Sequence, residues 1–395
     1  FANAGQISVS YCEPWANRSA PLKMLKWMLQ SDAPLLFRPQ LDWQQWRWGL
    51  QFLGQCNDRA FERNVAQLVA LGAYSHAALK QLVAQTGLQY HRLERGIAHY
   101  FTTQAALDDA GAAAQVMQSF GVQRRVVTCE ELLRIEPALQ PFAAQIRGGT
   151  YTPTDESGDA HAFTQGLAQL CAQRGAVWMY GHDIERLQAQ AGAAAPLVLV
   201  RERASGRHQQ LRADAVVVAC GSYSGALLRG VGVDLPIYPG KGYSATLDIL
   251  RPEAAPNVSM IDDAMKCAIT RLGTQLRVAG TIELNGYNLA LDTALARARC
   301  QMLTRRVERV MPGVCDTREA AEGGNPRYWC GLRPATPTNI PFIGGTRVRG
   351  LWVNAGHGTL GWTHGAGSGL ALAQLISGER PETAFQFMGQ APATA

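Results

Sequence analysis

The stretch LWVNAGHGTLGWTHGAGSGLAL, residues 351–372, constrains the fold more than any other part of the chain. A short apolar run leads into a segment with six glycines, and a helix-like pattern follows. Glycine allows backbone conformations that other residues avoid and lets other groups approach closely. The order of strand, glycine-rich turn and helix predicts one unit of an α/β layer. The turn is either purely structural or presents N–H groups at the helix N-terminus to an anionic ligand.

The strands of this sequence are of two kinds. The run from Val216 to Val218 is apolar at every position, as in a strand buried on both faces, and Cys220-Gly221-Ser222 then turns it toward a helix. Residues 235–249 and 266–282 instead alternate polar and apolar side chains, which indicates a half-covered antiparallel sheet. We therefore expect an α/β layer beside an antiparallel sheet.

Three helices are predicted from apolar spacing and capping residues. The first lies between Asn57 and Gly87, and the second begins at Thr102 or Thr103 and ends at Gly121. The third covers residues 159–174 and is followed by a predicted strand at 176–180. This helix and strand would pack as a unit of the α/β layer.

Composition excludes several classes of protein. The 395 residues are 47% hydrophobic and 17% charged, which is typical of a soluble globular chain with a large core. The formal charge is +6, but the arginines are scattered, so no nucleic-acid surface is indicated. The nine cysteines form no C-x-x-C pair, which favours reduced thiols in the cytoplasm, and we expect no bound metal. No apolar run is long enough to predict a membrane-spanning helix.

The segment from Gly356 to Gly361 matches the pattern G-x-G-x-x-G, but its context differs from that of a dinucleotide fingerprint. Such a fingerprint needs a second parallel strand that ends in an acidic residue further along the chain. The residues after Gly361 include Pro381 and Pro392 and offer no such strand. We therefore do not interpret this segment as a dinucleotide fingerprint.

An arginine lies within an apolar, proline-fixed segment, WCGLRPATPTNIPFIG, residues 329–344. Arg333 stands between Leu332 and Pro334, so its guanidinium must pair with a buried carboxylate of the protein or with one on a ligand. The residues alone favour the internal pair.

The segment DWQQWRWGLQFL, residues 42–53, places four large apolar side chains on one face of a helix: Trp43, Trp46, Leu50 and Leu53. This face is either a membrane-interface anchor or, more commonly for such a pattern, a face that packs on the core.

Several blocks in order resemble the flavoprotein D-amino-acid dehydrogenases, in the wider group of D-amino-acid oxidase and glycine oxidase. The blocks are FANAGQIS, FTQGLAQL, CGSYS, YPGKGYS, AITR, YWCGLRPATP and NAGHGTLGWT. The similarity runs from residue 1 to about residue 380. It implies an α/β fold with α+β elements, in which a Rossmann-like FAD-binding layer is interleaved with an antiparallel-sheet substrate domain. We assign residues 1–40, 141–234 and 331–380 to the FAD-binding layer, 41–140 and 235–330 to the substrate domain, and 381–395 to a tail.

The chain departs from this family at its start. In the family, a strand, a G-x-G-x-x-G turn, a helix and a second strand precede the ANAGQIS segment and hold the FAD pyrophosphate and ribose. That unit, roughly 30 residues or more, is missing before Phe1. We therefore expect an N-terminally truncated chain, a fragment with weak or absent FAD retention that could be inactive.

The resemblance implies roles for particular residues. Arg333 would bind the substrate carboxylate, with Tyr243 and His357 as pocket neighbours that are equally well explained as packed or hydrogen-bonded structural residues. The FAD-contacting positions would be Asn3, Ala4, Gly5, Gln6, Ile184, Ala219, Gly221, Gly331, Gly356, His357, Gly358, Thr359 and Leu360.

The resemblance also implies a reaction and its partners. A D-amino acid would be deaminated to a 2-oxo acid and ammonia, by hydride transfer from its Cα to flavin N5. Electrons would pass to a quinone or other respiratory acceptor, and the protein would be cytoplasmic and peripheral on the inner membrane. The alternatives are an amine oxidase of the glycine, sarcosine or D-proline type, and a non-catalytic amino-acid-binding protein.

Overall fold

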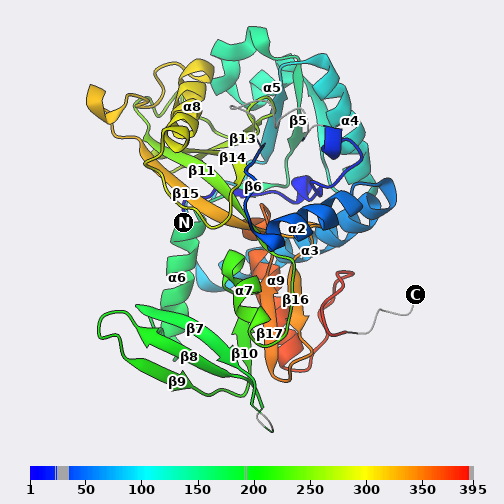
Figure 1. The fold of residues 1–395 in the computed structure, drawn as a ribbon. Coiled ribbons are helices and arrows are strands. Elements are labelled where there is room, and N and C mark those ends of the chain that lie inside the picture. Colours follow the sequence, from blue (N-terminus) through cyan, green and yellow to red (C-terminus); the bar gives the residue numbers. More distant parts are fainter. Residues whose placement is uncertain (23, 25–34, 191, 193, 391–395) are drawn as a thin grey trace.

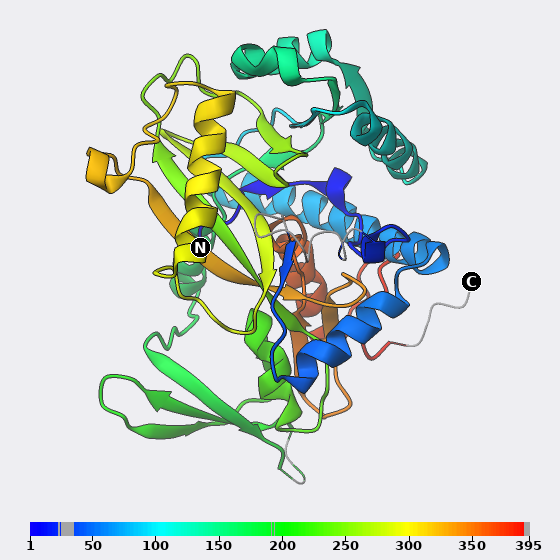
Figure 2. The ribbon, with the colours of Figure 1, turned by 45° about the horizontal axis from the view of Figure 1, so that its top comes forward.

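A computed structural model describes residues 1–22, 24, 35–190, 192 and 194–390 (Figure 1). Two sheets dominate it, a nine-stranded mixed sheet and a three-stranded sheet that is flanked by helices. Figures 1 and 2 show the large sheet and the helix α8 above, the small sheet with α9 below it, and a separate three-stranded meander at the bottom. Parts of the predicted segment 1–40 (residue 23 and residues 25–34) and of the predicted tail (391–395) lie outside the described residues.

The large sheet has the strand order β15-β11-β14-β13-β12-β3-β5-β4, with β2 beside β14. Neighbouring strands are antiparallel except at β12 with β3 and β14 with β2. The strands are β2 (Leu35–Phe37), β3 (Ile97–Phe101), β4 (Arg125–Thr128), β5 (Gly148–Thr152), β11 (Tyr238–Asp248), β12 (Ser259–Asp262), β13 (Cys267–Leu272), β14 (Gln275–Leu284) and β15 (Arg327–Ala335).

One face of the large sheet forms the main core. Leu276, Val278 and Ile269 are fully buried there, in one cluster with residues of the helix α8 (Ala294–Val310). The helix α5 (Cys129–Ile135) and the 3-10 helix η2 (Pro137–Gln145) contribute further residues to this cluster. The alternation of residues 235–249 and 266–282 therefore predicted the strands and their apolar face.

The opposite face of the sheet is polar and is nevertheless buried. We call it the polar face and define it by Gly242, Ser244, Thr246, Ser259, Thr270, Arg277, Gly331 and Arg333, which alternation and register place together. Ser244, Thr246 and Arg277 are each at most 8% exposed. The expectation of a half-covered sheet is wrong, because both faces are covered.

The second sheet has the order β10-β17-β16, with β10 (Val216–Val218) parallel to β17 (Leu351–Ala355) and β16 (Phe342–Gly345) antiparallel to it. The helix α9 (Gly361–Ile376) follows β17 and packs along α3 (Asp58–Thr86). Val217 is 43% exposed, so the expectation that the valine run is buried on both faces is wrong at this residue. Within the described residues β10 has a strand neighbour on one edge only.

The predicted strand at residues 176–180 is also wrong. These residues are irregular, and Val177 and Tyr180 are 87% and 74% exposed. A strand needs a hydrogen-bonding neighbour, and no described residue pairs with this segment. The chain instead continues into the antiparallel meander β7 (His182–Gln188), β8 (Leu197–Glu202) and β9 (His208–Leu211).

The three predicted helices are confirmed, with their caps. Asn57 caps α3 through its side chain, and Gly87 ends it with a left-handed φ of 66°. Thr103 caps α4 (Gln104–Ser119), and Asp159 caps α6 (Ala160–Gln173). The shorter elements are β1 (Gln6–Ile7), η1 (Val9–Tyr11), α2 (Trp43–Gly54), β6 (Glu156–Ser157), η3 (Gly221–Tyr223), α7 (Ser224–Arg229) and η4 (Ala320–Glu322).

The predicted domain boundaries shift in the structure. The strands β2 and β5 and the C-terminal half of β15 were assigned to the FAD-binding layer, but all three belong to the large sheet. They hydrogen-bond to strands of the predicted substrate domain, so sheet membership and not sequence order sets the division. All nine cysteines lie within the described residues and are free thiols. No described helix is long and apolar enough to cross a membrane.

Candidate functional site

The glycine-rich turn lies at the carboxyl edge of the small sheet. Because β10 and β17 are parallel, the residues that follow them, 219–221 and 356–360, emerge at the same edge. Gly356 and Gly358 have φ values of 86° and 55°, which side chains other than glycine rarely adopt. The Gly358 N–H donates to the Pro334 carbonyl at 3.0 Å, so the turn lies directly beside Arg333 in the chain fold.

The helix that follows the turn starts without a side-chain cap. Leu360 is the N-cap residue of α9, and its side chain cannot accept a hydrogen bond from the first turn. The N–H groups of that turn therefore remain available, and the helix dipole favours negative charge beside them. This end of the sixteen-residue helix is suited to an electron-rich ligand edge.

Arg333 lies on the polar face, over Gly242. A Cβ atom on Gly242 would overlap the guanidinium of Arg333, so the position requires glycine. Nη1 of Arg333 donates to the Thr281 carbonyl at 3.0 Å, and within the described chain no carboxylate forms an ion pair with it. Burial lowers the pKa of Arg333 to about 10, which leaves it charged at neutral pH. The internal ion pair that the residues alone favoured is therefore wrong, and the guanidinium is open to a ligand anion.

Other polar atoms of this region also lack partners. Ser244 Oγ and Thr281 Oγ1 are buried and have no hydrogen-bond partner among the described residues. Nη1 of Arg277 lacks a hydrogen bond too, although it lies 4.0 Å from the Asp159 carboxylate. Buried polar groups in folded proteins are almost always satisfied. Their concentration here indicates a place for a polar ligand.

Gly331 is the second glycine of the polar face that a neighbouring side chain requires. The indole of Trp329 lies across it, so a Cβ on Gly331 would overlap the ring. Trp329, Gly331 and Arg333 alternate along β15 and share the polar face. Along β15 this face therefore presents in turn an aromatic ring, a glycine without a side chain and a guanidinium.

The N-terminal segment covers the polar face. Asn3 Oδ1 accepts from the Gly5 N–H at 3.0 Å, and Gly5 has a left-handed φ of 75°. Gln6 Nε2 donates to Ser259 Oγ at 2.9 Å, which joins the segment to β12. The structure thus brings Gly5 and Gln6 beside the polar face, and Asn3 and Ala4 directly precede them in the chain.

A cavity of about 780 Å³ lies between this segment and the helices α3, α6 and α9. Its wall includes Asn3, His161 and three residues at the start of α9, Gly361, Trp362 and Gly365. This volume is within the range of small-molecule and cofactor sites. Arg333 does not line it, so the cavity and the guanidinium are separate parts of the candidate site.

The remaining predicted cofactor positions are divided between two places. Ala219 and Gly221 follow β10, and Ser222 Oγ donates to the Leu332 carbonyl at 3.3 Å, which connects this turn with the strand of Arg333. Ile184 lies on β7 of the meander, is 49% exposed and pairs with Val200. Ile184 is therefore not among the residues that surround Arg333.

His357 and Tyr243 both have structural partners. His357 Nε2 lies 2.9 Å from Ser368 Oγ of α9, and burial lowers the pKa of the imidazole to about 4. Tyr243 occupies the face of β11 opposite to Gly242, where its hydroxyl donates to Glu283 Oε2 at 2.6 Å. Burial raises the pKa of Tyr243. The expectation that Tyr243 is a pocket neighbour of Arg333 is wrong, because the two side chains lie on opposite faces.

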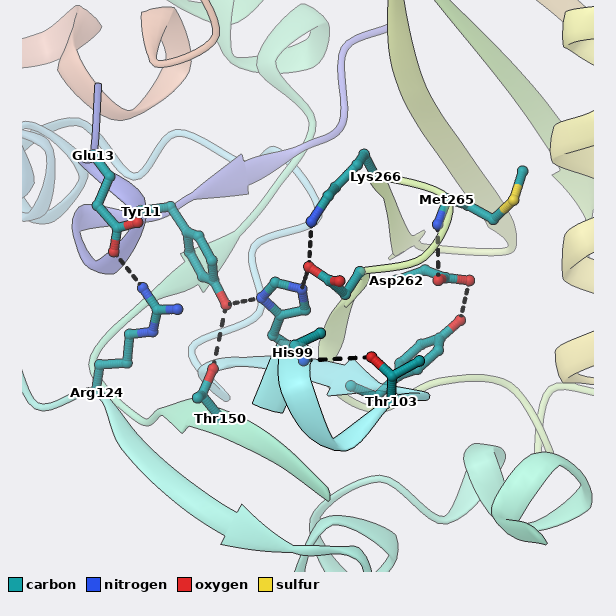
Figure 3. Close-up of polar contacts among 12 residues, drawn as sticks. Tyr11, Glu13, His99, Thr103, Arg124, Thr150, Asp262, Met265 and Lys266 are labelled. Carbon is teal, nitrogen blue, oxygen red and sulfur yellow. Dashed lines mark hydrogen bonds and ion pairs between the residues drawn. The ribbon is translucent and has the colours of Figure 1, made fainter. Parts of the chain in front are cut away.

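Sequence reasoning missed a buried network at the other end of the large sheet (Figure 3). His99 of β3 shares the face of Ile261 and Thr150, and its Nδ1 lies 2.8 Å from the Tyr11 hydroxyl. Its Nε2 lies 3.4 Å from Asp263 Oδ1, to which Lys266 also binds. Burial lowers the pKa of His99 to about 4. No motif could reveal this network, because its members come from four distant segments.

A carboxylate of this network is held in its charged form. Burial by itself raises the pKa of Asp263, but the neighbouring His99 and the positive charge of Lys266 together lower it to about 2. In the same network, Arg124 lies over the Tyr11 ring at 4.8 Å and pairs with Glu13 (Figure 3).

The chain is similar to known proteins in sequence and in structure. The sequence profile of a family described as FAD dependent oxidoreductase matches residues 1–375. A D-amino acid dehydrogenase of Dechloromonas aromatica (strain RCB) is 48% identical over 388 residues, which is 98% of this chain and 90% of that protein. One of Granulibacter bethesdensis is 43% identical, over 96% of this chain and 87% of that protein.

Solved structures show the same fold at low sequence identity. A glycine oxidase from Geobacillus kaustophilus superposes with a TM-score of 0.68 at 23% identity, covering 82% of this chain and 84% of that one. An L-alpha-glycerophosphate oxidase from Mycoplasma pneumoniae with FAD bound gives a TM-score of 0.62 at 15% identity, covering 78% and 79%. The expected α/β fold is confirmed. The truncation stays a prediction, because the comparisons do not test it.

A buried histidine under the turn predicts acid sensitivity. His364 is fully buried, lies 3.5 Å from Cys12 Sγ, and burial lowers its pKa to about 3. Below about pH 6.5 the unfolded chain binds a proton at this position while the folded chain does not, so folding stability falls on acidification. When the pH falls from about 7 to about 5, we expect the free energy of unfolding of His364→Gln to decrease by about 2 kcal/mol less than that of the wild type.

Urea unfolding at the two pH values measures this difference. His91→Gln, which changes an exposed imidazole, is the control and should retain the wild-type pH dependence. Equal decreases of the free energy of unfolding between the two pH values in His364→Gln and in the wild type would contradict the assignment.

Proposed function

The chain belongs to the FAD-dependent oxidoreductase family, and we propose that it oxidises D-amino acids to 2-oxo acids and ammonia. The family supplies the cofactor, FAD, and the curated relatives that cover nearly the whole chain are named D-amino acid dehydrogenases. The observation that carries the proposal is Arg333, a half-buried guanidinium with no carboxylate partner in the described chain, placed beside the glycine turn.

The residues of the site fit a flavin ring. Gly356 and Gly358 take left-handed φ values that favour glycine, and the uncapped start of α9 would stabilise negative charge on the ring. A Cβ on Gly356 would come within 2.7 Å of Thr336, so the turn could not carry a side chain there. We assign Gly356, His357, Gly358, Thr359 and Leu360 to the ring end. Asn3, Ala4, Gly5, Gln6, Ala219, Gly221 and Gly331 would border the rest of the site, and the role of Ile184 toward the nucleotide stays a prediction.

FAD, when bound, would supply a two-electron acceptor for the hydride of the substrate Cα. Arg333 would hold the substrate carboxylate with two parallel N–H donors and so fix the direction of the Cα–H bond. Thr281 and Gly242 position the guanidinium, through its hydrogen bond to the carbonyl and through the flat surface below it. The substrate amine reacts in its neutral form, and the imine that results is hydrolysed by water to the 2-oxo acid and ammonia. His357 and Tyr243 carry no proton in this scheme.

The test is anaerobic reduction of the FAD-loaded chain by a panel of D-amino acids, followed with a dye acceptor. We expect D-alanine to bleach the flavin absorbance and yield pyruvate, with Arg333→Met lowering kcat/KM by about 100-fold or more, because charged hydrogen bonds are lost. Arg305→Met, an exposed site on α8, is the control. Bleaching by glycine or sarcosine alone would favour an amine oxidase. Amino-acid binding without bleaching by any member of the panel would favour a binding protein.

The glycine under Arg333 offers a second test. In Gly242→Ala the new methyl group must displace the guanidinium, so we expect KM for D-alanine to rise at least about tenfold, with a smaller change in kcat. Gly54→Ala, where a Cβ meets no neighbour, should leave both constants unchanged. An unchanged KM in Gly242→Ala would show that Arg333 does not bind substrate in the position described.

The electron acceptor is proposed to be a respiratory quinone, reached by contact of α2 with the membrane surface. Support comes from the apolar face of this helix, which does not pack on the core: Trp43, Trp46, Leu50 and Leu53 are 69%, 46%, 66% and 49% exposed. The opposite face, with Trp48 and Phe52, is buried. The core-packing interpretation of the sequence is therefore wrong, and exposed tryptophans suit the membrane interface.

Sedimentation with vesicles that contain anionic lipid measures this contact. We expect the double variant Trp43→Ser, Trp46→Ser to lose about tenfold in vesicle affinity, because two large apolar side chains no longer leave water. Trp178→Ser, which removes an exposed tryptophan outside α2, is the matched control. Equal binding by the two variants would contradict the assignment of α2.

A further inference from the structure

A second polar pocket lies on the face of β11 opposite to Arg333. Its volume is about 320 Å³, and it is bordered by the residues after β2, by the loop after β14 and by the start of α8. Lys241 and Glu283 lie opposite each other on β11 and β14, and each is only 2% exposed. A buried ammonium and a buried carboxylate thus line one small pocket.

The two side chains are not in ion-pair contact, and Lys241 Nζ lies 5.1 Å from the centre of the Tyr243 ring. Lys241 Nζ donates to the Ala290 carbonyl at 2.6 Å, and the described residues hold no carboxylate in ion-pair contact with it. An ammonium has three N–H donors, so this contact uses one of them. Burial of an incompletely paired cation is costly, which makes an anionic ligand group favourable at Lys241.

Glu283 also retains capacity for a partner. Its Oε2 accepts from the Tyr243 hydroxyl at 2.6 Å and its Oε1 from Asn285 Nδ2 at 2.9 Å. Arg38, whose side chain is 50% exposed at the rim, has its Nε 3.8 Å from Oε1. A carboxylate can accept about four hydrogen bonds, so the oxygens can receive a further donor.

We propose that this pocket binds a small zwitterion, an α-amino acid, with its carboxylate at Lys241 and Arg38 and its ammonium at Glu283. A simple anion would satisfy Lys241 but would lie beside the Glu283 carboxylate, and a simple cation would lie beside the Lys241 ammonium. Only a ligand that carries both charges meets both residues favourably. The pocket volume suits a small amino acid, and Leu295 offers an apolar wall for its side chain.

The pocket shares its strands with the candidate active site. Gly242 lies between Lys241 and Tyr243, and the pairing of β11 with β14 is irregular at this position. On the other face, Arg333 lies over Gly242 and donates to Thr281, whose φ is 54°. A ligand held by Lys241 and Glu283 therefore contacts the same strand pair that positions Arg333, and its binding would alter substrate affinity at the other face.

Titration calorimetry with glycine, the smallest zwitterionic amino acid, tests the proposal on the full chain. The Arg333→Met variant is used, so that the candidate substrate site does not contribute. We expect saturable binding with a dissociation constant on the order of 1 mM. Lys241→Met and Glu283→Gln should each weaken it at least about tenfold, and Lys80→Met, an exposed lysine of α3, should leave it unchanged.

A further variant and two further ligands complete the test. Arg38→Gln changes a side chain that is 50% exposed at the rim of the pocket, and it should weaken glycine binding even if the two buried variants fail to fold. Acetate and methylamine, each with one of the two charges, should bind at least about tenfold more weakly than glycine. Absence of glycine binding, acetate binding as tight as that of glycine, or glycine binding that Arg38→Gln leaves unchanged would overturn the proposal.

Discussion

The structure depends on one arrangement of charge, a half-buried guanidinium without an internal carboxylate. Arg333 is held by a single carbonyl and by the absence of a side chain at Gly242. Such a cation costs free energy unless a ligand anion completes it, so the site is built at the expense of folding stability. The other face of the large sheet stabilises the fold, because a continuous apolar core packs there under α8. The apolar face of the sheet therefore stabilises the fold, and the polar face provides the groups for ligand binding.

Local features of the sequence predicted local structure well. The helix caps at Asn57, Thr103 and Asp159 act over three or four residues, so their information is contained in the sequence around them. The alternation of residues 235–249 likewise determines which side chains share a face. Arg333 and the turn at Gly356 were identified because unusual residues stood in unusual contexts, and the structure brings them together.

Properties that depend on distant partners were not predictable. Tyr243 and Arg333 lie on opposite faces because Gly242 pairs with Gly331, and this register is set by the assembled sheet. Tyr11, His99 and Asp263 are far apart in the sequence and meet only after β3 and β12 pair. The helix face with Trp43 and Trp46 has the pattern of a core contact, but Trp48 and Phe52 occupy the core instead. In each case the deciding interaction joins segments that no local pattern relates.

The exposed edge of β10 has a consequence for the behaviour of the molecule in concentrated solution. The peptide groups on that edge have no neighbouring strand in the described chain, and Val217 in the middle of β10 is 43% exposed. Such edges recruit strands from other molecules. Self-association of this protein would therefore begin at the small sheet, through backbone pairing between chains, and would leave the large sheet and its two faces unchanged.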